Sequence, residues 1–272
     1  MNFELKEEAH MSNSRIAAGA TPASGLNRAE PLSGLTILVT GAGRGIGRAC
    51  ALACASAGAE VIAVSRTEAD LVALAEDESR GRIRTMVADV AAEDFPARIR
   101  ALPRIDGLVN NAGTNRLQPL PEVDTATLDH LLNLNVRAAF LVSQAAAIRM
   151  LELGRGGSIV HVSSQMGHVG GPKRAVYCMT KHAIEGLTKA MAIDLASAGI
   201  RVNAVAPTIV ETPMTAPFFE DDAYRAFALA TIPMGRVAQP EDVAEAVVYL
   251  SSPAAGMVTG TSLRVDGGAT AQ

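Results

Sequence analysis

The chain has 272 residues, 49% of them hydrophobic, and a formal net charge of −4 at pH 7. This length suits one large α/β domain with a buried core. The weak negative charge and the lack of a dense Lys/Arg tract argue against a nucleic-acid binder, and no run reaches the roughly 18 apolar residues that a membrane span requires. The cysteines form no C-x-x-C pair and no metal-ligand spacing is present, so we expect no metal and three free thiols in a reducing compartment: Cys50, Cys54 and Cys178.

The first 33 residues are polar, mixed in charge and without the apolar core of a signal peptide. Glu4, Glu7 and Glu8 argue against an organellar transit peptide. We therefore expect a flexible extension over 1–33, or at most an arm used in oligomers. A single domain over 34–272 and a cytoplasmic location complete this interpretation.

From Leu35 onward, apolar runs alternate with amphipathic stretches. The runs lack strict polar alternation, which is typical of strands buried on both faces. We expect strands at Thr36–Thr40, Val61–Ser65, Ile83–Ala88, Gly107–Asn110, Ser158–Ser163, Arg201–Ala204 and Ser262–Val265. We expect helices at Ile46–Ala57, Glu68–Asp77, Glu93–Leu102, Thr125–Leu153, Ala175–Ala198 and Pro240–Leu250. This order predicts an α/β fold, a single Rossmann-type doubly wound parallel sheet of about seven strands with helices on both faces.

A glycine-rich loop, Gly41-Ala42-Gly43-Arg44-Gly45-Ile46-Gly47, joins the first expected strand to the first expected helix. Glycines let the backbone approach phosphate oxygens, and a helix N-terminus offers N–H groups and partial positive charge. The spacing G-x-x-x-G-x-G differs from the usual G-x-G-x-x-G. Its place at the start of a βαβ unit predicts a binding site for a diphosphate.

The end of the second expected strand bears on the choice between NAD and NADP. An acidic residue there would bind the ribose 2′-hydroxyl and repel a 2′-phosphate. This strand ends in Ser65 and Arg66, and Arg44 in the glycine loop adds a second positive charge. Because arginine suits phosphate, we expect NADP as the cofactor, with NAD less favoured. Asp89 and Val90, after the third expected strand, are placed to contact the adenine.

Tyr177 and Lys181 lie four residues apart, so on a helix the phenol and the ammonium share one face. Free tyrosine titrates near pH ~10, and a nearby ammonium would lower that pKa toward the working range. Ser164, thirteen residues before Tyr177, comes from another element and can hold a substrate oxygen beside the phenol. Tyr-x-x-x-Lys alone is common; together with the nucleotide loop it predicts a proton-transfer site. We interpret His161 and His168 as structural, because the sequence shows no orienting partner for them.

These features resemble the short-chain dehydrogenase/reductase family over roughly 35–268. The segment from Thr40 to Gly47 is similar to its cofactor loop, and Asn110-Asn111-Ala112-Gly113 to its sheet-stabilising motif. Val265-Asp266-Gly267-Gly268 resembles its C-terminal signature. Four residues match its catalytic tetrad in order and spacing: Asn135, Ser164, Tyr177 and Lys181.

The resemblance implies reversible hydride transfer between a nicotinamide and a carbonyl or secondary alcohol. It implies that Tyr177 is the general acid and base, that Lys181 lowers its pKa and binds the nicotinamide ribose, and that Ser164 orients the carbonyl. Asn135 would hold a water that connects Lys181 to solvent. The implied cofactor contacts are Gly41, Arg44, Gly45, Ile46, Gly47, Ser65, Arg66, Asp89, Val90, Asn111, Ala112, Gly113, Tyr177, Lys181, Pro207, Ile209 and Thr212.

Within the family, the chain looks most like the NADP-dependent dicarbonyl/L-xylulose reductases. The segments that carry this likeness are 63–71, 162–165, 176–178 and 203–208. The last contains Pro207-Thr208 where most family members have Pro-Gly. Two departures leave the substrate open: Arg174 stands where that subgroup has a substrate-contacting histidine, and Gly113 where it has alanine.

Residues 212–235 form the longest irregular stretch and hold four of the nine aromatic residues of the chain. Scarce aromatics gathered in one connection predict a lid that closes over the substrate and excludes water. A peripheral helical cap that only packs is the alternative. The expected substrate contacts are Ser164, Gln165, Arg174, Tyr177 and Met214.

Three functions are compared. The first is an NADP(H)-dependent oxidoreductase of a small carbonyl or secondary alcohol: a sugar, polyol or dicarbonyl. The second is a 3-oxoacyl-[acyl-carrier-protein] reductase, which predicts a basic cluster that Arg137, Arg149 and Arg174 do not form. The third is a non-catalytic NADP-binding regulator, which predicts a missing tetrad residue. We expect a small-molecule substrate, no nucleic-acid or membrane partner, and a homo-oligomer through the long helices, a tetramer rather than a dimer.

Overall fold

The computed structural model describes residues 30–78 and 80–272. Its sheet has seven parallel strands in the order β3-β2-β1-β4-β5-β6-β7. The strands are β1 (Thr36–Thr40), β2 (Glu60–Ser65), β3 (Ile83–Val87), β4 (Gly107–Asn110), β5 (Gly157–Val162), β6 (Ile200–Pro207) and β7 (Ser262–Val265). The strand order reverses between β1 and β4, and ligands bind at such a switch point in open α/β sheets. The predicted fold class is confirmed.

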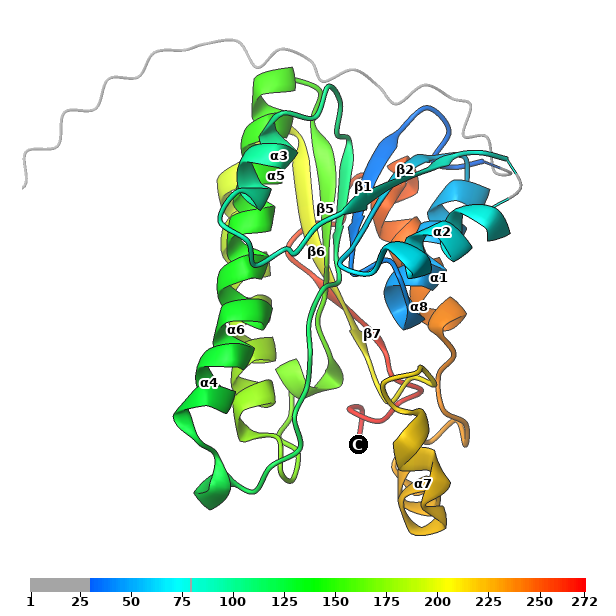
Figure 1. The fold of residues 1–272 in the computed structure, drawn as a ribbon, viewed down its shortest axis with the longest axis vertical. Helices are drawn as coiled ribbons and strands as arrows, with labels where there is room; N and C mark the ends of the chain where they lie inside the picture. The colour runs from blue at the N-terminus through cyan, green and yellow to red at the C-terminus, as the bar shows by residue number, and fades with distance from the viewer. Residues whose placement is uncertain (1–29, 79) are drawn as a thin grey trace, which may run out of the picture.

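Helices cover both faces of the sheet (Figure 1). They are α1 (Gly45–Ser56), α2 (Glu68–Asp77), α3 (Phe95–Arg100), α4 (Thr125–Leu132), α5 (Ala139–Leu153), α6 (Ala175–Leu195), α7 (Asp222–Ala230) and α8 (Pro240–Ser251). In Figure 1, α1, α2 and α8 lie on one side of the strands, and α3, α5 and α6 lie on the other. Two separate apolar layers result, one beneath α1 and α8 and one beneath α3, α5 and α6.

Small residues make close packing possible on the α1 face. Cys50 and Cys54 are completely buried there, and α1 packs directly against α8. Burial raises the pKa of the Cys54 thiol to about 12, with the nearby charge of Glu245 adding to the effect. All three cysteines are free thiols, as expected, and those of α1 serve as small apolar core residues.

The helix expected over Thr125–Leu153 is interrupted by a turn of π-helix. This wider turn spans Asn133–Ala138 and separates α4 from α5. By length and composition the whole run could cross a membrane, so the expectation that no segment is apolar enough for a membrane span was wrong. Half of its apolar window is buried, and α5 packs on α3 and β4. We therefore interpret it as a core helix.

Several elements differ from their expected bounds by one or more residues, and two of the differences bear on the site. β6 extends to Pro207, since it pairs with β5 on one side and with β7 on the other. The stretch expected to be irregular, 212–235, contains a 3₁₀ turn at Ala216–Glu220 and then α7. The Asp221 carboxylate caps α7 by accepting from the N–H of Ala223 at 2.9 Å. Aspartate is a favoured N-cap residue, so the sequence contained this signal for the start of a helix.

The ordered domain begins earlier than the expected boundary at residue 34. Leu32 is completely buried and its N–H donates to the carbonyl of Ala57 at 2.9 Å. The Glu30 carboxylate accepts hydrogen bonds from Arg80 and Arg82 at 3.0 and 3.1 Å. Residues 30–33 therefore belong to the packed domain. The rest of the expected extension, residues 1–29, lies outside the described residues.

Candidate active site

The loop between β1 and α1 takes its shape from glycine. Gly41 (φ 65°) and Gly45 (φ 53°) adopt left-handed backbone conformations that side chains disfavour. A Cβ on Gly47 would lie 2.1 Å from the carbonyl oxygen of Gly41. No side chain caps the start of α1, so the first N–H groups of this helix are left as donors for an anion.

The motif at the end of β4 fixes this loop from the neighbouring strand. The Asn111 side chain donates to the carbonyls of Thr40 at 2.9 Å and Gly41 at 3.2 Å. The backbone N–H groups of Asn111 and Ala112 donate to the Thr40 hydroxyl at 3.0 and 3.1 Å. Asn110 bonds to the Ala139 carbonyl of α5 at 2.8 Å. These bonds hold the glycine loop at the carboxyl edge of the sheet.

A cavity of about 270 Å³ lies beside the loop, at the ends of β2 and β3. Both arginines expected to bind phosphate have acidic neighbours there. Arg44 donates to Asp70 of α2 at 2.7 and 3.0 Å, and Arg66 lies 3.9 Å from Asp89. Asp70 was not anticipated, because only the fold brings α2 beside the loop. The residues expected at the adenine end line this cavity: Ser65, Arg66, Asp89 and Val90.

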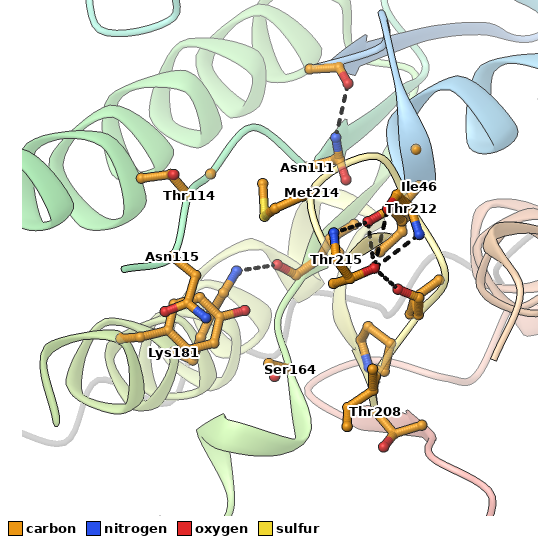
Figure 2. Close-up of a pocket in the computed structure, with 18 of the residues that line it drawn as sticks. Ile46, Asn111, Thr114, Asn115, Ser164, Lys181, Thr208, Thr212, Met214 and Thr215 are labelled. Atoms are coloured by element: carbon orange, nitrogen blue, oxygen red, sulfur yellow. Dashed lines mark hydrogen bonds between the residues drawn. The ribbon is translucent and has the colours of Figure 1, made fainter. Parts of the chain in front are cut away.

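A larger cavity of about 570 Å³ runs from the glycine loop to α6. The expected residues that line it are Gly41, Arg44, Gly45, Ile46, Gly47, Asn111, Ala112, Gly113, Ser164, Gln165, Arg174, Tyr177, Lys181, Pro207, Ile209, Thr212 and Met214. Lining residues that the expected set lacked include Asn115 and Thr208. In the view of Figure 2, Ser164 lies between Lys181 and Thr208. Asn135 is the one expected site residue outside both cavity walls.

Ser164 is held by the turn that follows β5. It precedes a short 3₁₀ helix (Gln165–Gly167), and its hydroxyl oxygen accepts from the Met166 N–H at 3.1 Å. This bond uses one lone pair and leaves the hydroxyl proton free to donate. Both Ser163 and Ser164 border the cavity, but the Ser163 hydroxyl is buried without a hydrogen-bond partner among the described residues.

Lys181 is buried one helical turn beyond Tyr177. Its ammonium lies 5.6 Å from the centre of the Tyr177 ring and donates to the Val162 carbonyl of β5 at 2.8 Å. Burial lowers the pKa of Lys181 to about 8, while the negative charge of Glu185 opposes this effect. The amine can therefore change its charge close to neutral pH.

The Tyr177 hydroxyl does not have the lowered pKa expected from its lysine neighbour. Burial raises its pKa, and the Ser164 hydrogen bond and the Arg174 charge act in the opposite direction. The Lys181 ammonium is engaged with the β5 backbone. The sequence spacing correctly places Tyr177 and Lys181 on one helix face. It does not show whether burial or the neighbouring charges dominate the pKa of the Tyr177 phenol.

Asn135 sits within the π-helical turn and ties two segments to it. Its side-chain oxygen accepts from the Thr114 N–H at 2.9 Å, and its amide donates to the Thr114 carbonyl at 2.8 Å. The same amide donates to the Thr180 hydroxyl of α6 at 3.2 Å. Wider π turns often occur at functional sites. Here the turn aims the amide between the segment after β4 and α6.

Two histidines near the site have partners that the sequence does not reveal. His161 is buried between the Ser143 and Thr188 hydroxyls, each 2.9 Å away, and burial with the Lys181 charge lowers its pKa to about 4. It is neutral at physiological pH.

His168 contacts a buried acid of α6. Its Nε2 atom lies 3.3 Å from the carboxylate of Glu185 and 3.0 Å from the Ser262 hydroxyl. The same carboxylate oxygen accepts from Ser262 at 3.0 Å. The second Glu185 oxygen is buried and has no hydrogen-bond partner among the described residues. A negative charge is thus held one turn from Lys181.

Aromatic residues from 212–235 close one side of the cavity. Phe218 and Tyr224 line it, with ring centres 5.6 Å apart. Phe219 packs edge-on against Tyr224 at 5.8 Å. A guanidinium nitrogen of Arg174 lies 3.4 Å from the Tyr224 hydroxyl, which links α7 to the start of α6.

Comparison with known proteins agrees with this geometry. The family model described as enoyl-(acyl carrier protein) reductase matches residues 41–270. L-xylulose reductase of Mesocricetus auratus is 45% identical over 240 residues, 87% of this chain and 97% of the relative. The 2-dehydro-3-deoxy-D-gluconate 5-dehydrogenase of Bacillus subtilis (strain 168) is 38% identical over 248 residues, 89% of this chain and 97% of the relative.

A solved structure from Beutenbergia cavernae is similar throughout. It is provisionally described as an NAD(P)-dependent gluconate 5-dehydrogenase and contains NADP at low occupancy. It covers 89% of this chain and 100% of its own, with 40% identity and a TM-score of 0.85. The expected cofactor, NADP, is therefore confirmed in a close structural relative.

A doubly wound sheet with a glycine loop at its switch point, facing a Ser, Tyr and Lys cluster, defines a dinucleotide-dependent oxidoreductase. The extent of the match and the identity of the relatives decide the family. This chain belongs to the short-chain dehydrogenase/reductase family.

Proposed function

We propose that the protein is an NADP(H)-dependent oxidoreductase that interconverts a small carbonyl compound and its secondary alcohol. The substrate class is a sugar, polyol or dicarbonyl, and Tyr177 is the general acid and base. One observation carries the proposal: Ser164, Tyr177 and Lys181 border a single cavity that continues to the glycine loop. Relatives named as a sugar reductase and a sugar-acid dehydrogenase support the substrate range.

The cavity residues fit a nicotinamide dinucleotide. The close approach at Gly47 leaves space only for backbone, and α1 begins with uncapped N–H groups that suit a diphosphate. β2 ends in Ser65 and Arg66 without a carboxylate, which favours NADP. Arg44 and Arg66 would turn from their acidic neighbours to the 2′-phosphate. When bound, the cofactor supplies the hydride for reduction or takes it up in oxidation.

The side chains supply and guide the proton. In reduction, the Tyr177 hydroxyl gives its proton to the substrate oxygen, and in oxidation it takes one back. Ser164 donates its free hydroxyl proton to the same oxygen. The Lys181 ammonium stabilises the phenolate that forms. Asn135 keeps the neighbouring segments in place, and the expected water would bind the remaining lone pair of its amide oxygen.

A 3-oxoacyl-[acyl-carrier-protein] reductase, which would reduce the ketone of a carrier-bound acyl chain, is the second candidate; the matching family model is described as another reductase of carrier-bound acyl chains, the enoyl-(acyl carrier protein) reductase. The acidic run Glu220-Asp221-Asp222 within 212–235 works against an acidic carrier. A non-catalytic regulator is disfavoured, since all four tetrad residues are present and three of them face the cavity.

We further propose that 212–235 acts as a lid and that the chain forms a tetramer, with a dimer as the alternative. Large apolar side chains are exposed on α5 and α6, which supports assembly through these helices: Phe140, Leu151, Met179 and Ile193. Light scattering after size-exclusion chromatography should give four chain masses. A monomer at micromolar concentration would contradict the proposal.

Absorbance at 340 nm tests the activity. NADPH and, separately, NADH are supplied with diacetyl, L-xylulose, other ketoses and an acetoacetyl thioester. We expect rapid NADPH oxidation with a sugar or dicarbonyl, abolished in Tyr177→Phe. Turnover of the thioester alone would support the second candidate. Failure of every carbonyl in a folded, NADPH-binding protein would contradict the proposed activity.

A further inference from the structure

The larger cavity has an unusual balance of charge. None of its described lining residues is Asp or Glu, whereas three are cationic: Arg44, Arg174 and Lys181. Arg44 is bonded to Asp70, and Lys181 is buried against the β5 backbone. Arg174 is different. Among the described residues, no carboxylate lies within ion-pair distance of its guanidinium, and the guanidinium's only hydrogen-bond partner is the Tyr224 hydroxyl at 3.4 Å. Its guanidinium has donors left for a ligand.

The backbone holds Arg174 next to the reacting group. Arg174 lies three residues before Tyr177 and immediately precedes α6. The residue before it, Lys173, is the only described non-glycine residue with a left-handed backbone (φ 59°), and its carbonyl accepts from the Gln118 N–H at 2.9 Å. Such strained residues persist where surrounding contacts hold them, often at functional sites. Arg174 and Tyr177 line the same cavity, and the Arg174 charge acts to lower the pKa of Tyr177.

Four residues that border the same cavity have a buried side-chain oxygen without a hydrogen-bond partner among the described residues. These oxygens are the amide oxygens of Asn115 and Gln165 and the hydroxyls of Ser163 and Thr208. They come from the segments that follow β4, β5 and β6, so they surround the site rather than form one patch. Figure 2 shows Asn115 near Lys181, and Thr208 on the other side of Ser164. Buried polar atoms normally have partners, so these positions suit the hydroxyl groups of a ligand.

We propose that the substrate is a polyhydroxy acid whose carboxylate is bound by Arg174 and whose hydroxyls are bound by Asn115, Gln165 and Thr208. This inference rests on the proposed function and narrows its substrate class. A hydride and a proton are added to the ketone, or removed from the secondary alcohol, and the carboxylate is unchanged. The planar guanidinium can hold a carboxylate through two parallel hydrogen bonds. The acidic run on the lid does not oppose this binding, because none of its residues lines the cavity.

Matched substrate pairs test the carboxylate contact. D-Gluconate and D-glucitol differ only in a terminal carboxylate or CH₂OH, and the pairs of manno and galacto configuration differ in the same way. Oxidation of each is followed with NADP⁺, and the measured quantity is the ratio of kcat/KM for acid over polyol. We expect a ratio of about 10 or more in at least one pair. In Arg174→Gln this ratio should fall about 10- to 100-fold, and Arg174→Lys should retain part of it.

Arg225→Gln is the matched control, because Arg225 is an exposed arginine of the lid helix that does not line the cavity. Its acid-to-polyol ratio should equal that of the unaltered protein. A ratio near one in every pair, or a ratio unchanged in Arg174→Gln, overturns the carboxylate proposal. If only neutral carbonyls are turned over and Tyr177→Phe stops that turnover, the proposed function stands and the carboxylate inference fails. If no acid, polyol or carbonyl is turned over, both fail.

Discussion

In the proposed cofactor half of the site, the loop between β1 and α1 presents mainly backbone groups, whereas in the proposed substrate half side chains from several segments surround one tyrosine. Gly41, Gly45 and Gly47 expose the backbone of this loop, and Arg44 is its one charged side chain. Around Tyr177, by contrast, the walls come from the segments after β4, β5 and β6 and from the lid.

The difference shows how one fold can keep its cofactor while changing its substrate. A backbone site tolerates few sequences, since any Cβ at Gly47 collides with the chain itself. A side-chain site can gain a guanidinium or lose an amide with little effect on the sheet. Substitutions in the two halves should therefore fail in different ways: loss of binding in one, loss of turnover or selectivity in the other.

The largest expected effect separates turnover from cofactor binding. Tyr177→Phe removes the proton donor and should lower kcat by about 10²- to 10⁴-fold. The affinity for NADPH, measured by its fluorescence, should change by less than about threefold, because the ring and its packing remain. If the variant keeps more than a tenth of the activity, Tyr177 is not the general acid and base of the reaction.

The opposite failure is expected from Gly47→Ala. The new methyl carbon would start 2.1 Å from the Gly41 carbonyl oxygen, so the loop must move. We expect the dissociation constant of NADPH to rise about 100-fold, equivalent to about 2.7 kcal/mol. Gly186→Ala is the control, since that position on α6 has open space and gains helix propensity. Unchanged affinity in Gly47→Ala would show that the loop does not bind the diphosphate.

Cofactor choice should depend on side chains even within the backbone-built half. Arg66→Gln removes a charge from the cavity beside β2, and the ratio of kcat/KM for NADPH over NADH should fall about tenfold. Arg84→Gln, at an exposed position of β3 outside that cavity, provides a matched loss of charge. Equal ratios in both variants would contradict the role assigned to Arg66.

The smallest effect is a shift in pH dependence. A lysine is charged below its pKa, so activity that needs the Lys181 ammonium is lost as pH rises through about 8. The charge of Glu185 raises the pKa of Lys181, and Glu185→Gln should therefore move this alkaline limb to lower pH. The readout is kcat/KM against pH, with Glu152→Gln on the α5 surface as control. A limb that stays in place would show that Glu185 is only structural.

The parts of the chain with short apolar runs between clear turn residues were predictable from the sequence. The bounds of β1, β4 and β7 agree with expectation, because short apolar runs lie between clear turn signals. α7 was not predicted, because it is a short helix whose main local signal is the Asp221 cap. Leu32 was expected in the extension, because the polarity of its sequence neighbours does not show that Leu32 is buried at the end of α1.

The same distinction between local patterns and tertiary contacts applies to the residues of the site. Residues within sequence motifs were placed by spacing, and most of them border the two cavities. Asn115, Asp70 and Glu185 acquire their importance only through tertiary contacts, so no local pattern marks them. The Tyr177 pKa was also beyond sequence reasoning, because burial outweighs its neighbours only once the protein is folded.

The π-helical turn at Asn133–Ala138 has a consequence for insertions and deletions. A π turn holds one residue more than the α-helical turn it replaces. Deleting one residue there would give a regular α-helical turn, and because both kinds of turn complete about 360°, α4 and α5 would keep their orientation. Thr127 and Leu131 would stay buried, whereas Asn135 would lose the wide turn from which its amide reaches Thr114 and Thr180. The number of residues in this turn is therefore as much a requirement of the proposed site as the identity of Asn135.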